Sequence, residues 1–200
     1  MSYHQPIQVE CFYGCDKELA LKVLHGQEEI KPSNNSWDWL GSGIYFWEYN
    51  PLRALSYAEE VANGTQKNKR RIKTPFVLGA MVSLGDCLNL IEPSAIALLE
   101  KAFNNFEKLC KKSNIEVPKN VDTRRYLDCS VVKYLHDVKM ETQNKPYDTV
   151  RAAFKEGKEI YPGSNFMTHD HIQIAVNNVS NVKGYFLPKP YSKYNPYLNA

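Results

Sequence analysis

Residues 41–48, GSGIYFWE, place two glycines directly before a run of aromatic side chains that ends in a carboxylate. Gly41 and Gly43 have no Cβ, so the main chain there can approach a ligand closely. If the following residues form a strand, Tyr45 and Glu48 point to opposite faces. The segment suits a flat ring that is stacked on aromatic side chains and hydrogen-bonded to main-chain groups. A core strand entered through a turn would have the same composition.

Three other stretches could complete a site of this kind. FYG at 12–14 ends a segment rich in β-forming residues, and RALSYA at 53–58 places Tyr57 on a helix that follows the aromatic strand. HIQIAV at 171–176 reads as a late strand on which His171 and Gln173 face the same way. Aromatic, amide and imidazole groups would then come from four separate parts of the chain.

In this order, the four blocks resemble the nicotinamide-binding half of the ADP-ribosyltransferase superfamily, and most closely its diphtheria-toxin-like and poly(ADP-ribose) polymerase branch. The resemblance covers about a third of the chain, and its middle block is the most specific. It implies a split β-sheet core with flanking helices and NAD+ as the substrate, without a metal. The cofactor-binding residues that it implies are Tyr13, Gly14, Gly43, Tyr45 and Tyr57.

The resemblance also implies roles at the reacting bond. The family has a histidine where this chain has Tyr13, and a catalytic glutamate at the head of the late strand, where this chain has His171 or Gln173. We therefore expect one of these two to take the catalytic position, with Glu48 supplying charge stabilisation and transfer limited to single ADP-ribose units. Arg151, on a predicted strand, is a candidate partner for the pyrophosphate.

Cleavage of the nicotinamide–ribose bond develops positive charge on the ribose, as in glycoside hydrolysis. Such a reaction needs the leaving group held in place, the ribose hydroxyls fixed and a nucleophile positioned. In this scheme the main chain of Gly14 holds the nicotinamide amide, while Tyr45 and Tyr57 enclose the ring. Gln173 or His171 bonds to the ribose hydroxyls.

The elements that must position these residues alternate irregularly. Helices are predicted in the N-terminal and middle parts and short strands towards the end, which indicates an α+β fold rather than a doubly wound parallel sheet. The predicted strands are 7–14, 44–47, 76–85, 147–154, 171–176 and 181–188, and the predicted helices are 16–26, 51–63, 94–113 and 123–138. We expect one domain over 1–188, followed by an extended C-terminal tail at 189–200.

Composition limits the possible classes of protein. A net charge of +3 does not by itself indicate nucleic-acid binding, and no apolar run is long enough to cross a membrane. The five cysteines include no CxxC pair, which argues against a disulfide framework and a structural zinc site. These features favour a cytoplasmic protein. The basic run at 67–73 is a solvated loop by default, and the first candidate for phosphate contacts if the acceptor is a nucleic acid.

Several residues have a structural interpretation beside a functional one. Arg53 is more typical of a solvated helix residue than of a site. Glu156 and Glu159, in the loop before the late strand, could contact an acceptor or simply be solvated. His169 and His171 share a face but have no third ligand, which zinc requires. Cys129 lies beside an apolar helix stripe, where a buried inert thiol is commoner than a nucleophile. Trp37 and Trp39 are either a lid over a cleft or part of the core.

The leading hypothesis is an NAD-dependent mono-ADP-ribosyltransferase that modifies a macromolecule, either protein or nucleic acid. Because such an enzyme would harm its own cell unless controlled, it could be the toxin of a toxin–antitoxin or phage-defence system with a neutralising antitoxin protein as partner. One alternative is a pseudo-enzyme that binds NAD or ADP-ribose without reaction. Another is a ribonuclease toxin that uses His169 or His171 as acid–base groups.

Overall fold

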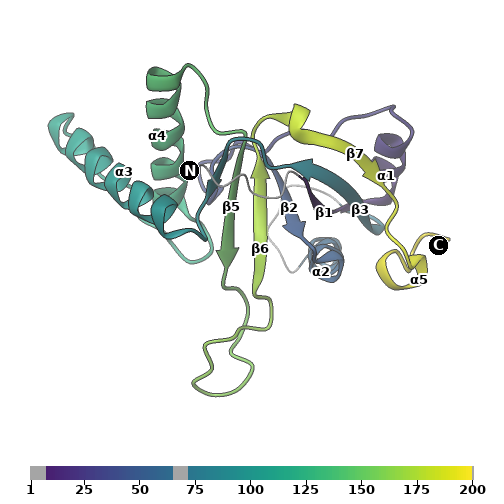
Figure 1. The fold of residues 1–200 in the computed structure, drawn as a ribbon. Helices are drawn as coiled ribbons and strands as arrows, with labels where there is room; N and C mark the ends of the chain where they lie inside the picture. The colour runs from purple at the N-terminus through teal and green to yellow at the C-terminus, as the bar shows by residue number, and fades with distance from the viewer. Residues whose placement is uncertain (1–7, 65–71, 200) are drawn as a thin grey trace.

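Seven strands form one mixed sheet in the computed structural model, which describes residues 8–64 and 72–199 (Figure 1). The strand order is β4-β5-β6-β2-β1-β3-β7, and each pair of neighbours is antiparallel except β4 and β5. The strands are β1 (Gln8–Asp16), β2 (Ile44–Glu48), β3 (Pro75–Ser83), β4 (Cys87–Asn89), β5 (Thr149–Phe154), β6 (His171–Val176) and β7 (Val182–Phe186). The described chain is a single α+β domain, as predicted.

Five α-helices accompany the sheet in the described residues. They are α1 (Lys17–Leu24), α2 (Pro51–Ala62), α3 (Pro93–Lys112), α4 (Tyr126–Gln143) and α5 (Tyr191–Tyr194), with a 3-10 turn η1 (Val179–Asn181). The Asn50 side chain accepts a hydrogen bond from the Arg53 N–H at the start of α2, and Pro51 takes the first helical position. Both features follow the sequence-based expectation for this helix start.

The helices divide between the two faces of the sheet. On one face, Ala20 and Val23 of α1 pack in a cluster with Tyr13 of β1 and Phe46 of β2. Because side chains alternate along a strand, Phe12 points to the opposite face, where it packs with residues of α2. Helices α3 and α4 pack over β5 and β6 on this second face, and Tyr45 belongs to their cluster. We call these the α1 face and the α2 face.

The sheet splits between two of its central strands. β1 pairs with β3 along its whole length, but with β2 only at Cys11 and Phe12. The first residues of β2 pair instead with β6, from Ile44 opposite Val176 to Trp47 opposite Gln173. The end of β1 therefore has a strand neighbour on one side only, among the described strands.

The predicted elements are present with shifted bounds, and three elements were missed. β4 and η1 have three residues each, which is too short for a periodic pattern. The expectation of an extended tail at 189–200 was wrong, because residues 191–194 form α5 and the chain then returns to the sheet. Asn195 is 1% exposed, accepts from the Val77 N–H at 2.7 Å and donates to its carbonyl at 3.0 Å.

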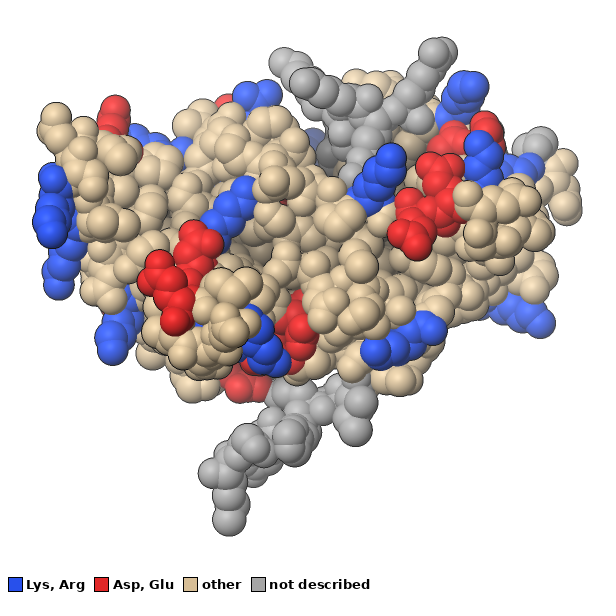
Figure 2. All heavy atoms as spheres, turned by 90° about the horizontal axis from the view of Figure 1, so that it is seen from above, with Lys and Arg blue, Asp and Glu red and all other residues tan. Residues whose placement is uncertain are grey.

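Charged side chains of both signs are interspersed on the face of the molecule that Figure 2 shows, in keeping with the small net charge of +3. Within the described residues, no helix is long and apolar enough to cross a membrane. Residues 67–71 of the basic run lie outside the described part of the chain, so the prediction of phosphate contacts there stays a prediction.

Candidate functional site

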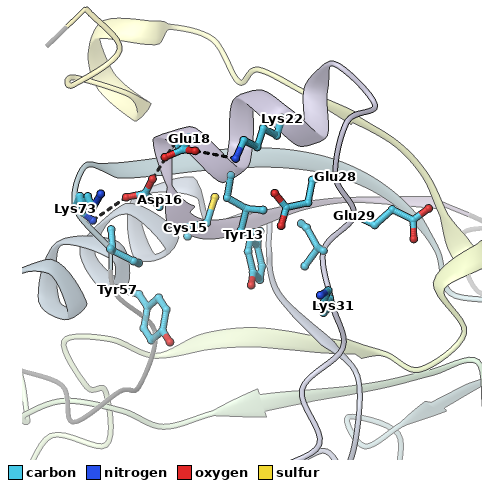
Figure 3. A pocket seen from close by; sticks show the side chains of 14 residues that line it. Tyr13, Cys15, Asp16, Glu18, Lys22, Glu28, Glu29, Lys31, Tyr57 and Lys73 are labelled. Carbon is cyan, nitrogen blue, oxygen red and sulfur yellow. Dashed lines mark hydrogen bonds and ion pairs between the residues drawn. The ribbon is translucent and has the colours of Figure 1, made fainter.

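A cleft of about 440 Å³ opens where β1 separates from β2 (Figure 3). Its lining comes from the end of β1, from α1, from the segment that follows α1, from α2 and from the segment before β3. Tyr13, Gly14 and Tyr57 are among the lining residues, and Figure 3 shows the rings of both tyrosines extending in the same direction from separate elements.

The cleft reaches both faces of the sheet. Its lining includes Leu19 and Lys22 of α1, which covers one face, and Tyr57 of α2, which covers the other. The hollow therefore extends past the edge of β1 from one helix to the other. The split between β1 and β2 provides that passage.

Gly14 directs its main-chain N–H and C=O into the split. Its cross-strand neighbour Val77 uses its own N–H and C=O to bind Asn195, so the pair Gly14–Val77 exchanges no hydrogen bonds. Consistent with this alternation, the Glu10 carbonyl accepts from the Tyr49 N–H on the β2 side of β1. Neither group of Gly14 is taken by a neighbouring strand in the described part of the chain.

Gly14 also has a structural reason to be glycine. An added Cβ would lie 2.2 Å from the main-chain oxygen of Ala54 and 3.3 Å from the Tyr57 ring. The backbone of α2 therefore crosses β1 at this point with no room for a side chain. That close crossing brings Tyr57 to the cleft.

The structure separates Tyr45 from the cleft that Tyr57 lines. The Tyr45 hydroxyl donates to the Gly41 carbonyl at 2.7 Å and accepts from the Leu40 N–H at 3.0 Å, and its ring packs with the α3–α4 cluster. Burial raises the pKa of this phenol well above its ordinary value. Tyr13, which points to the α1 face, lines the cleft in its place.

The main chain of Gly43 is occupied within the protein. Its N–H donates to the Ser33 carbonyl at 2.9 Å and its C=O accepts from the Ser33 N–H at 2.8 Å. With φ of 157°, its missing Cβ would stand 2.9 Å from the Val176 carbonyl oxygen. This explains the flexible backbone before the aromatic strand: two neighbouring segments approach Gly43 closely.

Glu48 and Arg151 bind each other rather than facing the cleft. Arg151 donates from Nε and Nη2 to the two carboxylate oxygens, at 2.5 and 2.8 Å, and from Nη1 to Asn89 Oδ1 at 3.2 Å. This bidentate ion pair raises the pKa of Arg151. The Arg151 guanidinium thus uses three of its donors within the sheet. Both oxygens of the Glu48 carboxylate, which was expected to stabilise charge, are engaged there as well.

His171 and Gln173 both project from β6 to the α2 face, as Tyr45 does. Gln173 Oε1 accepts from the indole Nε1 of Trp39 at 2.7 Å. The Trp39 ring packs on Phe154 at 4.5 Å between centroids, so this tryptophan belongs to the packed interior beside β6. His171 is buried between Trp47 and Phe154, with ring centroids 6.1 and 5.5 Å away.

The tautomer of His171 follows from its contacts. Nδ1 lies 2.5 Å from the His169 carbonyl oxygen, so the proton is assigned to Nδ1. Nε2 is buried without a hydrogen-bond partner in the described residues. Burial lowers the pKa of this imidazole below its ordinary value, which favours the neutral form with a free lone pair on Nε2.

Arg53 is the principal residue whose setting sequence reasoning missed. The expectation of a solvated side chain was wrong, because Arg53 is 5% exposed. Its guanidinium lies over the Trp47 ring at 5.6 Å and binds Glu156 at 2.8 Å and Glu60 at 3.4 Å. Its position four residues before Tyr57 on α2 was the available signal, since such residues share a helix face.

The remaining candidates have structural settings. Cys129 is 1% exposed, and burial raises the pKa of its thiol, in agreement with the interpretation of a buried inert cysteine. Trp37 is 39% exposed and stacks edge-on with Tyr126. No group of three or more His, Cys, Asp or Glu side chains suited to a metal ion occurs in the described ranges.

Charges of both signs line the cleft. Glu18 pairs with Lys22 at 2.7 Å, and Asp16 accepts main-chain hydrogen bonds from Lys73 and Thr74 that outweigh burial and lower its pKa. Lys31 and Lys73 also line the cleft and supply positive charge. The cleft thus offers main-chain groups, two aromatic rings and three lysines, together with the carboxylates of Asp16, Glu18, Glu28 and Glu29.

Comparison with known proteins finds similarity to a protein of unassigned activity. The chain is 28% identical over 207 residues to the uncharacterized protein MJ0359 of Methanocaldococcus jannaschii, covering 92% of this chain and 87% of that protein. No protein-family model matches the chain. No solved structure matches it either.

Proposed function

We propose that this protein binds NAD+ in the cleft at the split and transfers single ADP-ribose units to a macromolecule. The observation that carries the proposal is the pair of main-chain groups of Gly14, which face the split with a donor and an acceptor side by side and pair with no strand among the described residues. A carboxamide has one donor group and one acceptor group, so nicotinamide matches this edge. The convergence of the four sequence blocks on β1, β2, β6 and α2 also supports the proposal.

In this proposal the nicotinamide ring lies in the cleft beside Tyr57 and Tyr13, and the pyrophosphate lies towards Lys31 and Lys73. Tyr13 takes the place that sequence reasoning gave to Tyr45. Fixing the leaving group in this way aligns the glycosidic bond for cleavage, which is the entropic part of catalysis. The acceptor, and an antitoxin partner, stay predictions.

The test measures NAD+ binding by calorimetry and nicotinamide release by chromatography, with labelled NAD+ and a cell extract to detect transfer. Replacing Tyr57 with Ala should weaken NAD+ binding about tenfold or more, because stacking a flat ring on an aromatic side chain contributes about 1–3 kcal/mol. Tyr161→Ala, a 57% exposed tyrosine on the β5–β6 connection, is the control and should leave affinity unchanged. A folded protein that neither binds NAD+ nor releases nicotinamide contradicts the proposal.

A second candidate function is NAD+ binding without transfer. It is favoured by the engagement of Glu48 with Arg151 and of Gln173 with Trp39, which removes two of the three groups assigned to catalysis. Binding of NAD+ without nicotinamide release would establish it. For a histidine-based ribonuclease only the partly exposed His169 is accessible, because the His171 side chain has no exposed surface.

A further inference from the structure

The loop after β5 brings a carboxylate to the buried histidine of β6. Glu156 lies two residues beyond the end of β5, in the connection that extends past the end of the sheet in Figure 1. Its Oε2 is 2.8 Å from Arg53 Nη2 and 3.8 Å from His171 Nδ1. The Glu156 side chain is 30% exposed, so it lies at the boundary between this cluster and solvent.

Arg53 holds Glu156 in place beside His171. The guanidinium binds Glu156 at 2.8 Å and also binds Glu60 at 3.4 Å. Burial favours the neutral form of His171. Glu156 therefore brings a negative charge beside a neutral imidazole on the α2 face.

Polar atoms without a partner mark the same place. Trp47 Nε1, Arg53 Nε and His171 Nε2 are buried and have no hydrogen-bond partner in the described residues. Such groups are rare in folded proteins, because an unpaired buried donor or acceptor costs free energy that a ligand or water would recover. Arg53 and His171 both lie beside the Trp47 ring, whose centroid is 5.0 Å from that of the Tyr57 ring. Tyr57 in turn lines the cleft, so the cluster and the cleft are joined through two aromatic side chains.

We propose that Glu156, held by Arg53, is the carboxylate that acts on the ribose of NAD+ in this protein. The inference rests on the proposed function. Glu48 is bound bidentately by Arg151 on the α1 face, whereas Glu156 lies beside His171 on the α2 face. A carboxylate there stabilises the positive charge that develops on the ribose.

The bond between ribose C1′ and the nicotinamide nitrogen breaks, and both electrons stay on the nitrogen, so neutral nicotinamide leaves. A lone pair of the acceptor, which is water or a hydroxyl or amine of a macromolecule, forms the new bond to C1′. The acceptor's proton passes to the Glu156 carboxylate and from there to solvent, which the partial exposure of this side chain permits.

The experiment compares Glu156→Gln with Glu159→Gln. Glu159 lies in the same loop, and its carboxylate accepts a hydrogen bond from the Gly163 N–H at 2.9 Å rather than from Arg53. Both variants lose one negative charge from the same loop, which makes them comparable. Thermal melting should confirm that both are folded. The probes are NAD+, which has a cationic ring, and NADH, whose ring is neutral.

Glu156→Gln should reduce the preference for NAD+ over NADH, measured as the ratio of their dissociation constants, about fivefold, because the carboxylate attracts the cationic ring. It should also slow nicotinamide release about 100-fold. Glu159→Gln should change both quantities less than twofold.

Equal effects of the two substitutions, or an unchanged NAD+ preference in Glu156→Gln, would overturn the inference. If the wild-type protein binds neither dinucleotide, the proposed function fails and this inference fails with it. If the wild type prefers NAD+ and Glu156→Gln keeps that preference, only the role of Glu156 fails. The binding ratio decides this even for a protein that releases no nicotinamide.

Discussion

At the scale of single residues, Gly14 has two roles, one in the packing of α2 against β1 and one in the proposed binding of nicotinamide. Its missing Cβ allows the α2 backbone to approach within van der Waals distance, and the same residue turns its main-chain groups into the split. A substitution here changes the position of α2 and therefore of Tyr57. The site is thus sensitive to the volume of one methyl group.

Gly14→Ala should lower the free energy of unfolding by about 2 kcal/mol, because the new Cβ meets main-chain atoms that cannot move independently of the helix. Chemical denaturation measures this change. Gly184→Ala is the matched control: it also lies in a strand, and no atom stands within 4 Å of its added Cβ. A loss at Gly184 as large as that at Gly14 would contradict the proposed close crossing.

Arg53 shows why a residue's setting is hard to infer from its own type. A charged side chain on an amphipathic helix is usually solvated, and burial of an arginine requires paired charges. Its partners, Glu60 and Glu156, lie 7 and 103 residues away. Only the fold brings Glu156 to α2, so no local sequence pattern could have predicted the Arg53–Glu156 ion pair.

At the scale of elements, the C-terminal segment is part of the sheet's support rather than an appendage. After α5, Asn195 supplies both hydrogen bonds that a strand neighbour would give to Val77. The Tyr197 hydroxyl donates to Glu59 of α2 at 3.0 Å, and its carbonyl accepts from Lys17 of α1. The segment therefore contacts both helices that border the cleft.

Asn195→Ala should lower the free energy of unfolding by about 2–4 kcal/mol, because it leaves a buried N–H and a buried C=O of β3 unpaired. Asn199→Ala, at an exposed position of the same segment, should change it by less than about 0.5 kcal/mol. Thermal and urea unfolding both measure these changes. Similar stability of the two variants would show that the segment is not integral to the domain.

At the scale of the whole molecule, the buried His171 and the half-buried His136 link stability to pH. Burial lowers the pKa of His136 and of His171, and neither nitrogen of His136 has a hydrogen-bond partner in the described residues. The unfolded chain therefore binds protons more readily than the folded one just below the ordinary histidine pKa of about 6.5. Stability from these groups is complete above that value and is lost as the pH falls.

The free energy of unfolding should decrease from pH 7 to pH 5, and His136→Phe should reduce this decrease while keeping an aromatic contact with Tyr147. Urea unfolding at a series of pH values measures both slopes. His25→Gln, at an exposed position of the α1 end, should leave the slope unchanged. A slope that is identical in His136→Phe and the wild type would contradict the assignment.

The sequence alone determined the α+β class, most of the helices and strands, and the glycine–aromatic block of β2. These follow from local quantities: side-chain periodicity, cap residues such as Asn50, and the alternation of apolar residues along strands. The candidate residues Tyr13, Gly14 and Tyr57 were also named from local patterns, and the structure brings them to one cleft.

Only the tertiary structure decided which face each strand residue uses and which polar groups are already bound. Tyr45 lies away from the cleft and Glu48 is bound to Arg151 because strand order and register, rather than neighbouring residues, set those contacts. The same long-range contacts bring Glu156 to Arg53. They also leave the Gly14 main chain without a paired strand on the β2 side among the described residues. Such contacts join residues far apart in the chain, and a local pattern cannot encode them.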